Sequence, residues 1–123
     1  MSDNELLELA AKAVGMHVKA HRVDADDNFT HLVVGQKFTQ EKIDWNPLTD
    51  DGDALRLAAS LNLCVCFTLA EANPTFGTAM VGYSPWENKV PIATERYSEP
   101  SEKLAATRRA IVKAAAEIGK AMP

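Results

Sequence analysis

The sequence lacks a long apolar segment. No apolar run in its 123 residues reaches the roughly 18 residues that mark a transmembrane helix. The N-terminal stretch MSDNELLELAAKAVG is acidic and amphipathic, whereas a signal peptide needs a basic start and an unbroken apolar stretch. We therefore expect a cytoplasmic protein that has no membrane partner.

Cysteine is scarce, because Cys64 and Cys66 are the only two in the chain. Two cysteines do not make the disulfide framework of a secreted domain. Their spacing places both thiols on one face of a strand, but a zinc site needs wider spacing and a second ligand pair. We expect both to pack in the core as small apolar residues.

Catalytic signatures are also missing. The chain has no Gly-x-Gly-x-x-Gly, no P-loop and no Gly-x-Ser-x-Gly, and no internal repeat is visible. An enzyme is not excluded by this, since triads can assemble from distant residues. The net charge of −4 gives no general attraction for nucleic acid or for an anionic membrane.

The residues that are present predict an α+β fold in one domain spanning residues 1–123, with a mainly antiparallel sheet covered by helices as an α/β/α sandwich. The predicted element order is α-β-β-α-β-β-β-α. Helices are predicted over Asn4–Val14, over Asp50–Asn62, and from Ser98 or Ser101 to the C-terminus. Strands are predicted over Met16–Val23, Phe29–Val34, Leu63–Leu69, Phe76–Tyr83 and Val90–Arg96.

More specific predictions can be made for two of these elements and for one connecting segment. Leu63–Leu69 is a nearly continuous apolar run, typical of a central strand covered on both faces. Gly35–Pro47 is predicted as a long connection with a short strand near Gln36–Thr39. One apolar face is predicted for the last helix, made of Leu104, Ile111, Ala115, Ile118 and Met122.

The helix ends have recognisable caps. Ser2 and Glu5 have the spacing of a capping box, and Gly15 can adopt the left-handed conformation that ends a helix. Asp50 is a good N-cap for the second helix, and Asn62 can end it.

A cluster of carboxylates surrounds the start of the second helix, made of Asp44, Asp50, Asp51 and Asp53. Carboxylates at this density could hold Mg²⁺ or Ca²⁺. The alternative is a capped helix start, in which acidic residues suit the positive end of the helix dipole. We favour capping and predict no metal site. His17, His21 and His31 lack a ligand partner at metal spacing, so we predict neither catalysis nor metal binding there.

Aromatic residues occur in two predicted loops. Trp45 and Trp86 each lie beside a proline or an Asn-Pro pair, and Tyr83 and Tyr97 flank the second loop. A loop tryptophan either fills the edge of the core or contacts a partner. Filling the core is the more common outcome for a single apolar side chain.

Basic residues gather in the last helix, where Arg108, Arg109 and Lys113 could contact phosphate. The order of elements from Asp50 to Met122, α-β-β-β-α, is also that of double-stranded-RNA-binding domains. The acidic residues of the same helix dilute this charge, so a solvated helix face is the favoured interpretation.

Two segments together resemble a known family. WNPLTDDGDALRLAASLNL and KLAATRRAIVKAAAEIG are similar to the phage ABA-sandwich domain proteins, small proteins of tailed phages and prophages. The resemblance covers most of the chain and implies a layered helix–sheet–helix domain in a bacterial host cell. It implies no catalytic residue, ligand set or cofactor.

Three hypotheses about function follow. The first is a non-enzymatic accessory protein that binds a host protein or a small ligand through a surface with Trp45, Asp50, Asp51, Asp53, Tyr83 and Trp86. The second is a nucleic-acid-binding domain that uses Arg108, Arg109 and Lys113. The third is a small metal-dependent enzyme. Self-association is compatible with each of them, through an edge strand in Met16–Val34 or through an exposed helix face.

Overall fold

The computed structural model describes residues 2–23, 29–36, 43–70, 73–83 and 91–123. Within these ranges the elements are α1 (Asp3–Ala13), β1 (Met16–Val23), β2 (Phe29–Gln36), β3 (Ile43–Trp45), α2 (Asp51–Ser60), β4 (Leu63–Ala70), β5 (Asn73–Tyr83), β6 (Ala93–Tyr97), a 3-10 turn (Pro100–Glu102) and α3 (Lys103–Ala121). The predicted α+β class is confirmed. The prediction missed β3, and most of the short strand predicted near Gln36–Thr39 lies outside the described residues.

The strands form two antiparallel meanders. Sheet A has the order β1-β2-β3 and sheet B the order β4-β5-β6. The predicted central position of Leu63–Leu69 is wrong, because β4 is an edge strand of sheet B that pairs with β5. Its apolar run reflects one face packed on the core and one face that is only partly covered.

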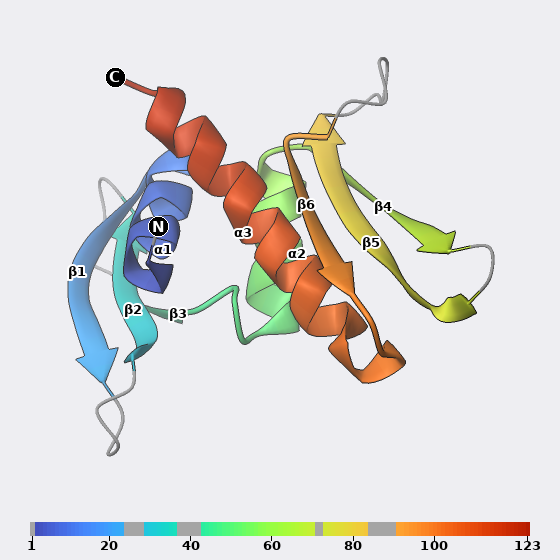
Figure 1. Cartoon of the computed structure of the whole chain (residues 1–123). Helices are drawn as coiled ribbons and strands as arrows, with labels where there is room; N and C mark the ends of the chain where they lie inside the picture. The colour runs from blue at the N-terminus through green and yellow to red at the C-terminus, as the bar shows by residue number, and fades with distance from the viewer. Residues whose placement is uncertain (1, 24–28, 37–42, 71–72, 84–90) are drawn as a thin grey trace.

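Helix α3 is the element that joins the two halves. It runs diagonally across the molecule, with α1 and sheet A on one side and sheet B on the other (Figure 1). It packs against α1, α2, β5 and β6. Small residues make this close packing possible, and the buried ones are Ala106, Ala110, Ala114, Ala115, Ala116 and Gly119. A β-carbon at Gly119 would overlap the carbonyl oxygen of Leu9, so α1 and α3 meet nearly backbone to backbone.

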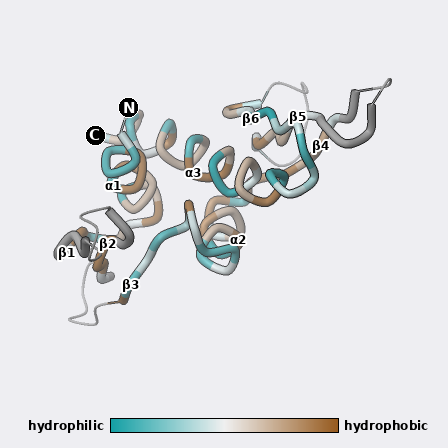
Figure 2. Tube along the Cα trace, turned by 60° about the horizontal axis from the view of Figure 1, so that its bottom comes forward, coloured by the Kyte–Doolittle hydropathy of each residue, from teal (hydrophilic) through white to brown (hydrophobic). Residues whose placement is uncertain are grey.

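The apolar face predicted for the last helix is only partly correct. Ile111 and Ala115 are buried, but Leu104 is 61% exposed and Met122 is 40% exposed. The error has a physical reason, since α3 is covered on several sides and alanines supply most of that surface. Each helix mixes hydrophobic and hydrophilic positions along its length (Figure 2).

The predicted caps are confirmed. Ser2 Oγ accepts a hydrogen bond from the N–H of Glu5 at 3.2 Å, and Asp50 Oδ1 accepts one from the N–H of Asp53 at 2.9 Å. Gly15 follows α1 with φ +76° and Asn62 follows α2 with φ +54°. Both residues thus adopt the left-handed conformation that ends a helix.

The chain contains a structural repeat that its sequence does not reveal. Gly15 and Asn62 are 47 positions apart, and β1 and β4 each begin at the next residue. In sheet A, Val18 pairs with Val34; 47 positions later, Val65 pairs with Val81 in sheet B. A helix followed by a three-stranded meander thus occurs twice, although no repeat is visible in the sequence. The repeat is hidden because it conserves caps and register rather than side chains.

Candidate functional site

The acidic loop before α2 is closed by its own hydrogen bonds. Asn46 is only 2% exposed, and its Oδ1 accepts a hydrogen bond from the N–H of Leu48 at 3.0 Å. Its carbonyl oxygen accepts from the N–H groups of Thr49 at 3.1 Å and Asp50 at 2.9 Å. The loop is therefore a compact turn that delivers the chain from β3 into α2.

The three aspartates of the predicted binding surface have structural partners. Asp50 caps α2. Asp53 accepts from the N–H of Asn46 at 3.0 Å and from Arg56 at 2.8 Å. Asp51 accepts from Arg108 of α3 at 2.6 Å. Across the described part of the chain, no group of three or more His, Cys, Asp and Glu side chains is arranged to hold a metal ion.

The aromatic residues of the same prediction do not come together. Trp45 is 4% exposed and belongs to the hydrophobic core, so it fills the core beside sheet A. Tyr83 lies at the end of β5 in sheet B and is 61% exposed. Trp86 lies outside the described residues. The structure thus leaves Tyr83 as the one described aromatic of this set at the surface.

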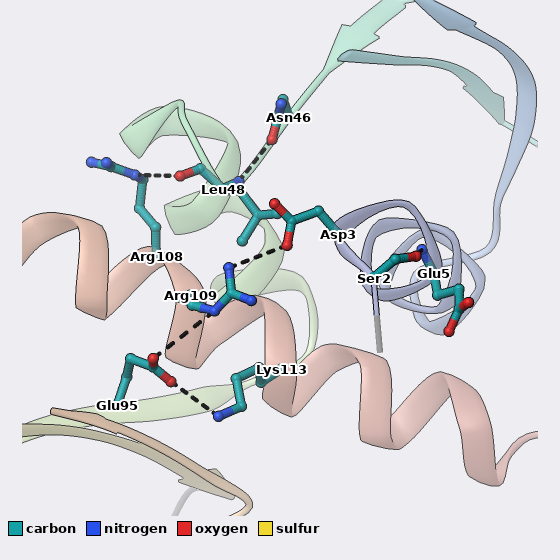
Figure 3. A network of polar contacts seen from close by, with 9 residues as sticks. All are labelled: Ser2, Asp3, Glu5, Asn46, Leu48, Glu95, Arg108, Arg109 and Lys113. Atoms are coloured by element: carbon teal, nitrogen blue, oxygen red, sulfur yellow. Dashed lines mark hydrogen bonds and ion pairs between the residues drawn. The ribbon is translucent and has the colours of Figure 1, made fainter. Parts of the chain in front are cut away.

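The three basic residues of α3 that were predicted to contact phosphate are paired within the chain (Figure 3). Arg108 donates from Nε to the carbonyl oxygen of Leu48 at 2.8 Å, in addition to its ion pair with Asp51. Arg109 donates to Asp3 Oδ1 at 3.2 Å. Lys113 donates to Glu95 Oε2 at 3.0 Å. Because each cation has an acidic partner, this row ties α3 to α1, to α2 and to β6.

The two cysteines are not core residues. Val65, Ala79, Val81 and Ala93 of sheet B belong to or pack against the core, so the alternating positions lie on the outer face of the sheet. Cys64 and Cys66 lie on that outer face and are partly exposed. The expectation of core packing fails because β4 is at the edge and only one face of sheet B is packed on the core.

Cys66 is a weak nucleophile in this position. Its partial burial, and then the nearby Cys64, raise the pKa of the Cys66 thiol. A raised pKa keeps the sulfur protonated near neutral pH, whereas nucleophilic attack and metal binding use the thiolate. Of the histidines, His17 is exposed on β1; the side chains of His21 and His31 lie outside the described residues.

The edges of the two sheets differ in chemistry. β1 contains Lys19 and Arg22, and its pairing with β2 has two register shifts. β3 is three residues long and contains Asp44; β6 is five residues long and contains Glu95 and Arg96. β4 is eight residues long, LCVCFTLA, and contains no charged residue.

The free side of β4 is the feature that sequence analysis missed, and we call it the β4 edge. Its pairing with β5 runs from Leu63 to Leu69 without a register shift. It lies at the rim of sheet B farthest from α3 (Figure 1). Phe67 is 43% exposed there, and Lys103 Nζ lies 4.5 Å from the centre of its ring. The absence of charge over eight residues is the signal that the sequence offers, but the same pattern is typical of a strand buried in the centre of a sheet.

Two grooves are lined by described residues, and neither brings reactive groups together. One of about 290 Å³ lies beside Arg96, Tyr97, Ser98 and Glu102. The other, of about 450 Å³, lies beside Leu6, Ile92, Thr94, Lys113 and Glu117, among others. Its one cation, Lys113, is already bound to Glu95 and to the carbonyl oxygen of Thr94.

Comparisons with protein-family models, curated proteins and solved structures gave no match. In the part of the chain that the structure describes, no helix is long and apolar enough to cross a membrane.

Proposed function

We propose that this chain is a small phage- or prophage-type accessory protein of the bacterial cytoplasm that acts by binding another polypeptide. The phage-type role is supported by the resemblance of WNPLTDDGDALRLAASLNL and KLAATRRAIVKAAAEIG to that family. A role without catalysis is supported by the contacts of the charged side chains, which bind other groups of the protein. The aspartates before and within α2 and the cations of α3 hold elements of the fold together.

The observation that carries this proposal is the uncharged β4 edge. An edge strand presents N–H and C=O groups that can bind a further strand, and natural proteins usually protect such an edge with charge, bulges or short length. β1, β3 and β6 each contain at least one charged residue, and β4 contains none. The one register shift of β4 lies near its end, between Leu69 and Ala70, so the pairing is regular from Leu63 to Leu69. Strand addition to such an edge is a common mode of polypeptide recognition.

A small-molecule ligand is the less favoured form of the proposal. Trp45 is buried in the core, and Tyr83 belongs to the other sheet. The aspartates of the predicted surface are bonded to protein groups. Polypeptide binding needs none of these residues, because the backbone of β4 supplies the hydrogen bonds.

Site-specific photo-crosslinking in bacterial cells tests the proposal. A benzoylphenylalanine replaces Thr68, which is exposed on the outer face of β4. A matched control replaces Thr94, which is exposed on the same face of sheet B but on β6. We expect irradiation to give a polypeptide adduct at position 68 and much less at position 94. Equal or absent adducts at the two positions would contradict binding at the β4 edge.

A further inference from the structure

The β4 edge is suited to a copy of itself. We infer that the strand added to β4 is β4 of a second copy of this chain, paired antiparallel across a two-fold axis. This inference rests on the proposed function and names the partner. The two copies of sheet B would then form one continuous sheet of six strands, and neither copy would leave its β4 edge open.

Self-pairing is favoured by the composition of the strand. A two-fold contact places the same surface on both sides, so any charge in the strand would meet the same charge in the partner. LCVCFTLA has no charge to repel, although the chain as a whole carries −4. The pairing of β4 with β5 is also regular from Leu63 to Leu69, and its one register shift follows Leu69, so a second strand can pair with this stretch without a bulge in the way.

Antiparallel pairing with a second copy is disfavoured at β1, the other eight-residue edge strand. Antiparallel self-pairing of β1 would bring Lys19 and Arg22 of two copies close together. The two register shifts between β1 and β2 also disturb the edge. For self-association we therefore favour β4 over an edge strand in Met16–Val34.

The register that fits best is centred on Cys66. It places Cys66 opposite Cys66 of the partner subunit and Val65 opposite Phe67 of the partner subunit, an aromatic and β-branched pair that stabilises sheets. Centring on Phe67 would instead set the two Phe67 rings face to face. Each of these rings carries a Lys103 ammonium group, so that register would bring two cations together.

Light scattering after size-exclusion chromatography tests the inference on the full chain. The wild-type protein should have twice the chain mass of 13.4 kDa. Cys66→Lys and Cys66→Asp should each shift the mass to that of one chain, because like charges would face each other at the axis. An equimolar mixture of the two variants should recover the double mass, which a misfolded variant could not do. Thr94→Lys is the matched control and should keep the wild-type mass.

Oxidative crosslinking tests whether the two β4 strands pair in the register centred on Cys66. With diamide as the oxidant, Cys64→Ser should still give a disulfide-linked dimer on a non-reducing gel, and Cys66→Ser should not. A wild-type mass of 13.4 kDa, or no recovery in the charge-swap mixture, would overturn self-pairing. If the chain is monomeric but position 68 crosslinks to a different protein, the proposed function stands and this inference fails. If position 68 crosslinks to nothing, both fail.

Discussion

The two helix-and-sheet units, α1 with sheet A and α2 with sheet B, share a backbone plan and differ in their edges. In both units a capped helix ends at a left-handed residue, and the next residue begins an edge strand. In both units the next strand runs antiparallel to the first in the same initial register. The first edge strand, β1, contains charged residues and has two register shifts along its length. The second, β4, contains no charged residue and has one register shift, after Leu69.

The shared features of the two units are those that the fold requires, and the edge residues are those that can vary. Caps, register and the burial of Val34 and Val81 recur because each unit must pack on α3. Edge chemistry is not needed for that packing. That one edge is charged and the other uncharged is therefore a difference that packing on α3 does not explain, and it motivates the proposal of binding at β4.

The largest expected effect tests whether the two units fold together through α3. Leu7 of α1 is fully buried and Leu57 of α2 is 3% exposed. Leu7→Ala and Leu57→Ala should each lower the free energy of unfolding by about 2–5 kcal/mol, from lost burial and the cavity left behind. Urea unfolding followed by circular dichroism should show one shifted transition for each variant.

The shape of the unfolding transition shows whether the two units unfold together or independently. Because α3 packs against α1 in one unit and against α2 and sheet B in the other, loss of either leucine should unfold the whole chain. Two separate transitions, with one unit left at wild-type stability, would show that the units are independent. Leu55→Ala is the matched control, because Leu55 is 70% exposed on α2, and it should change stability little.

The sequence predicted local structure better than packing. Helices, caps and most strands follow from the spacing of apolar residues and from capping residues such as Ser2 and Asp50. The edge position of β4 could not be predicted, because a strand that is apolar on both faces has the same pattern at the centre and at the edge of a sheet. The burial of α3 was underestimated because alanine gives a weak periodic signal.

The candidate site was harder to predict than the fold. Residue types in the sequence show that Asp51 and Arg108 are charged, but not that they bond each other at 2.6 Å across 57 positions. The aspartates before α2 and the basic residues of α3 each suggested a ligand, but Asp51 of the first group binds Arg108 of the second. The β4 edge differs from these clusters because it is marked by the absence of charged residues. That absence points to an open edge only when the strand order of sheet B is known.

A smaller effect is expected from two glycines that each lie against the backbone of a neighbouring element. A β-carbon at Gly119 would overlap the carbonyl oxygen of Leu9 between α3 and α1, and one at Gly77 would overlap that of Thr68 between β5 and β4. Gly119→Ala and Gly77→Ala should each cost about 1–3 kcal/mol, because backbone must move to make room. Thermal unfolding by calorimetry measures both.

Gly52 in α2 provides the control for these two variants. A β-carbon there would meet only the ends of the Arg56 and Asp50 side chains, of which the Arg56 guanidinium can move. The other contact, at 3.1 Å, is with the capping oxygen Asp50 Oδ1, which must shift by a few tenths of an ångström. Gly52→Ala should therefore cost less than either Gly119→Ala or Gly77→Ala, because helix propensity offsets that shift and no backbone has to move. Destabilisation equal to that of Gly119→Ala would mean that the close approach of α1 and α3 is not the cause.

The smallest expected effect compares the two helix ends directly. Gly15 and Asn62 occupy the same place in the repeat, with φ +76° and φ +54°, and no heavy atom of the described residues lies within 4 Å of a β-carbon added at Gly15. Glycine enters this conformation without steric cost, and asparagine is the next most tolerant residue. Asn62→Gly should therefore raise the free energy of unfolding by about 0.5 kcal/mol, and Gly15→Asn should lower it by a similar amount. The double swap should lie close to wild type, since α1 and α2 are not among the element pairs that pack together and the effects of sites without shared partners add. If Asn62→Gly instead destabilises the protein, its side chain has a role in the second unit that Gly15 lacks in the first, and the two ends are not equivalent.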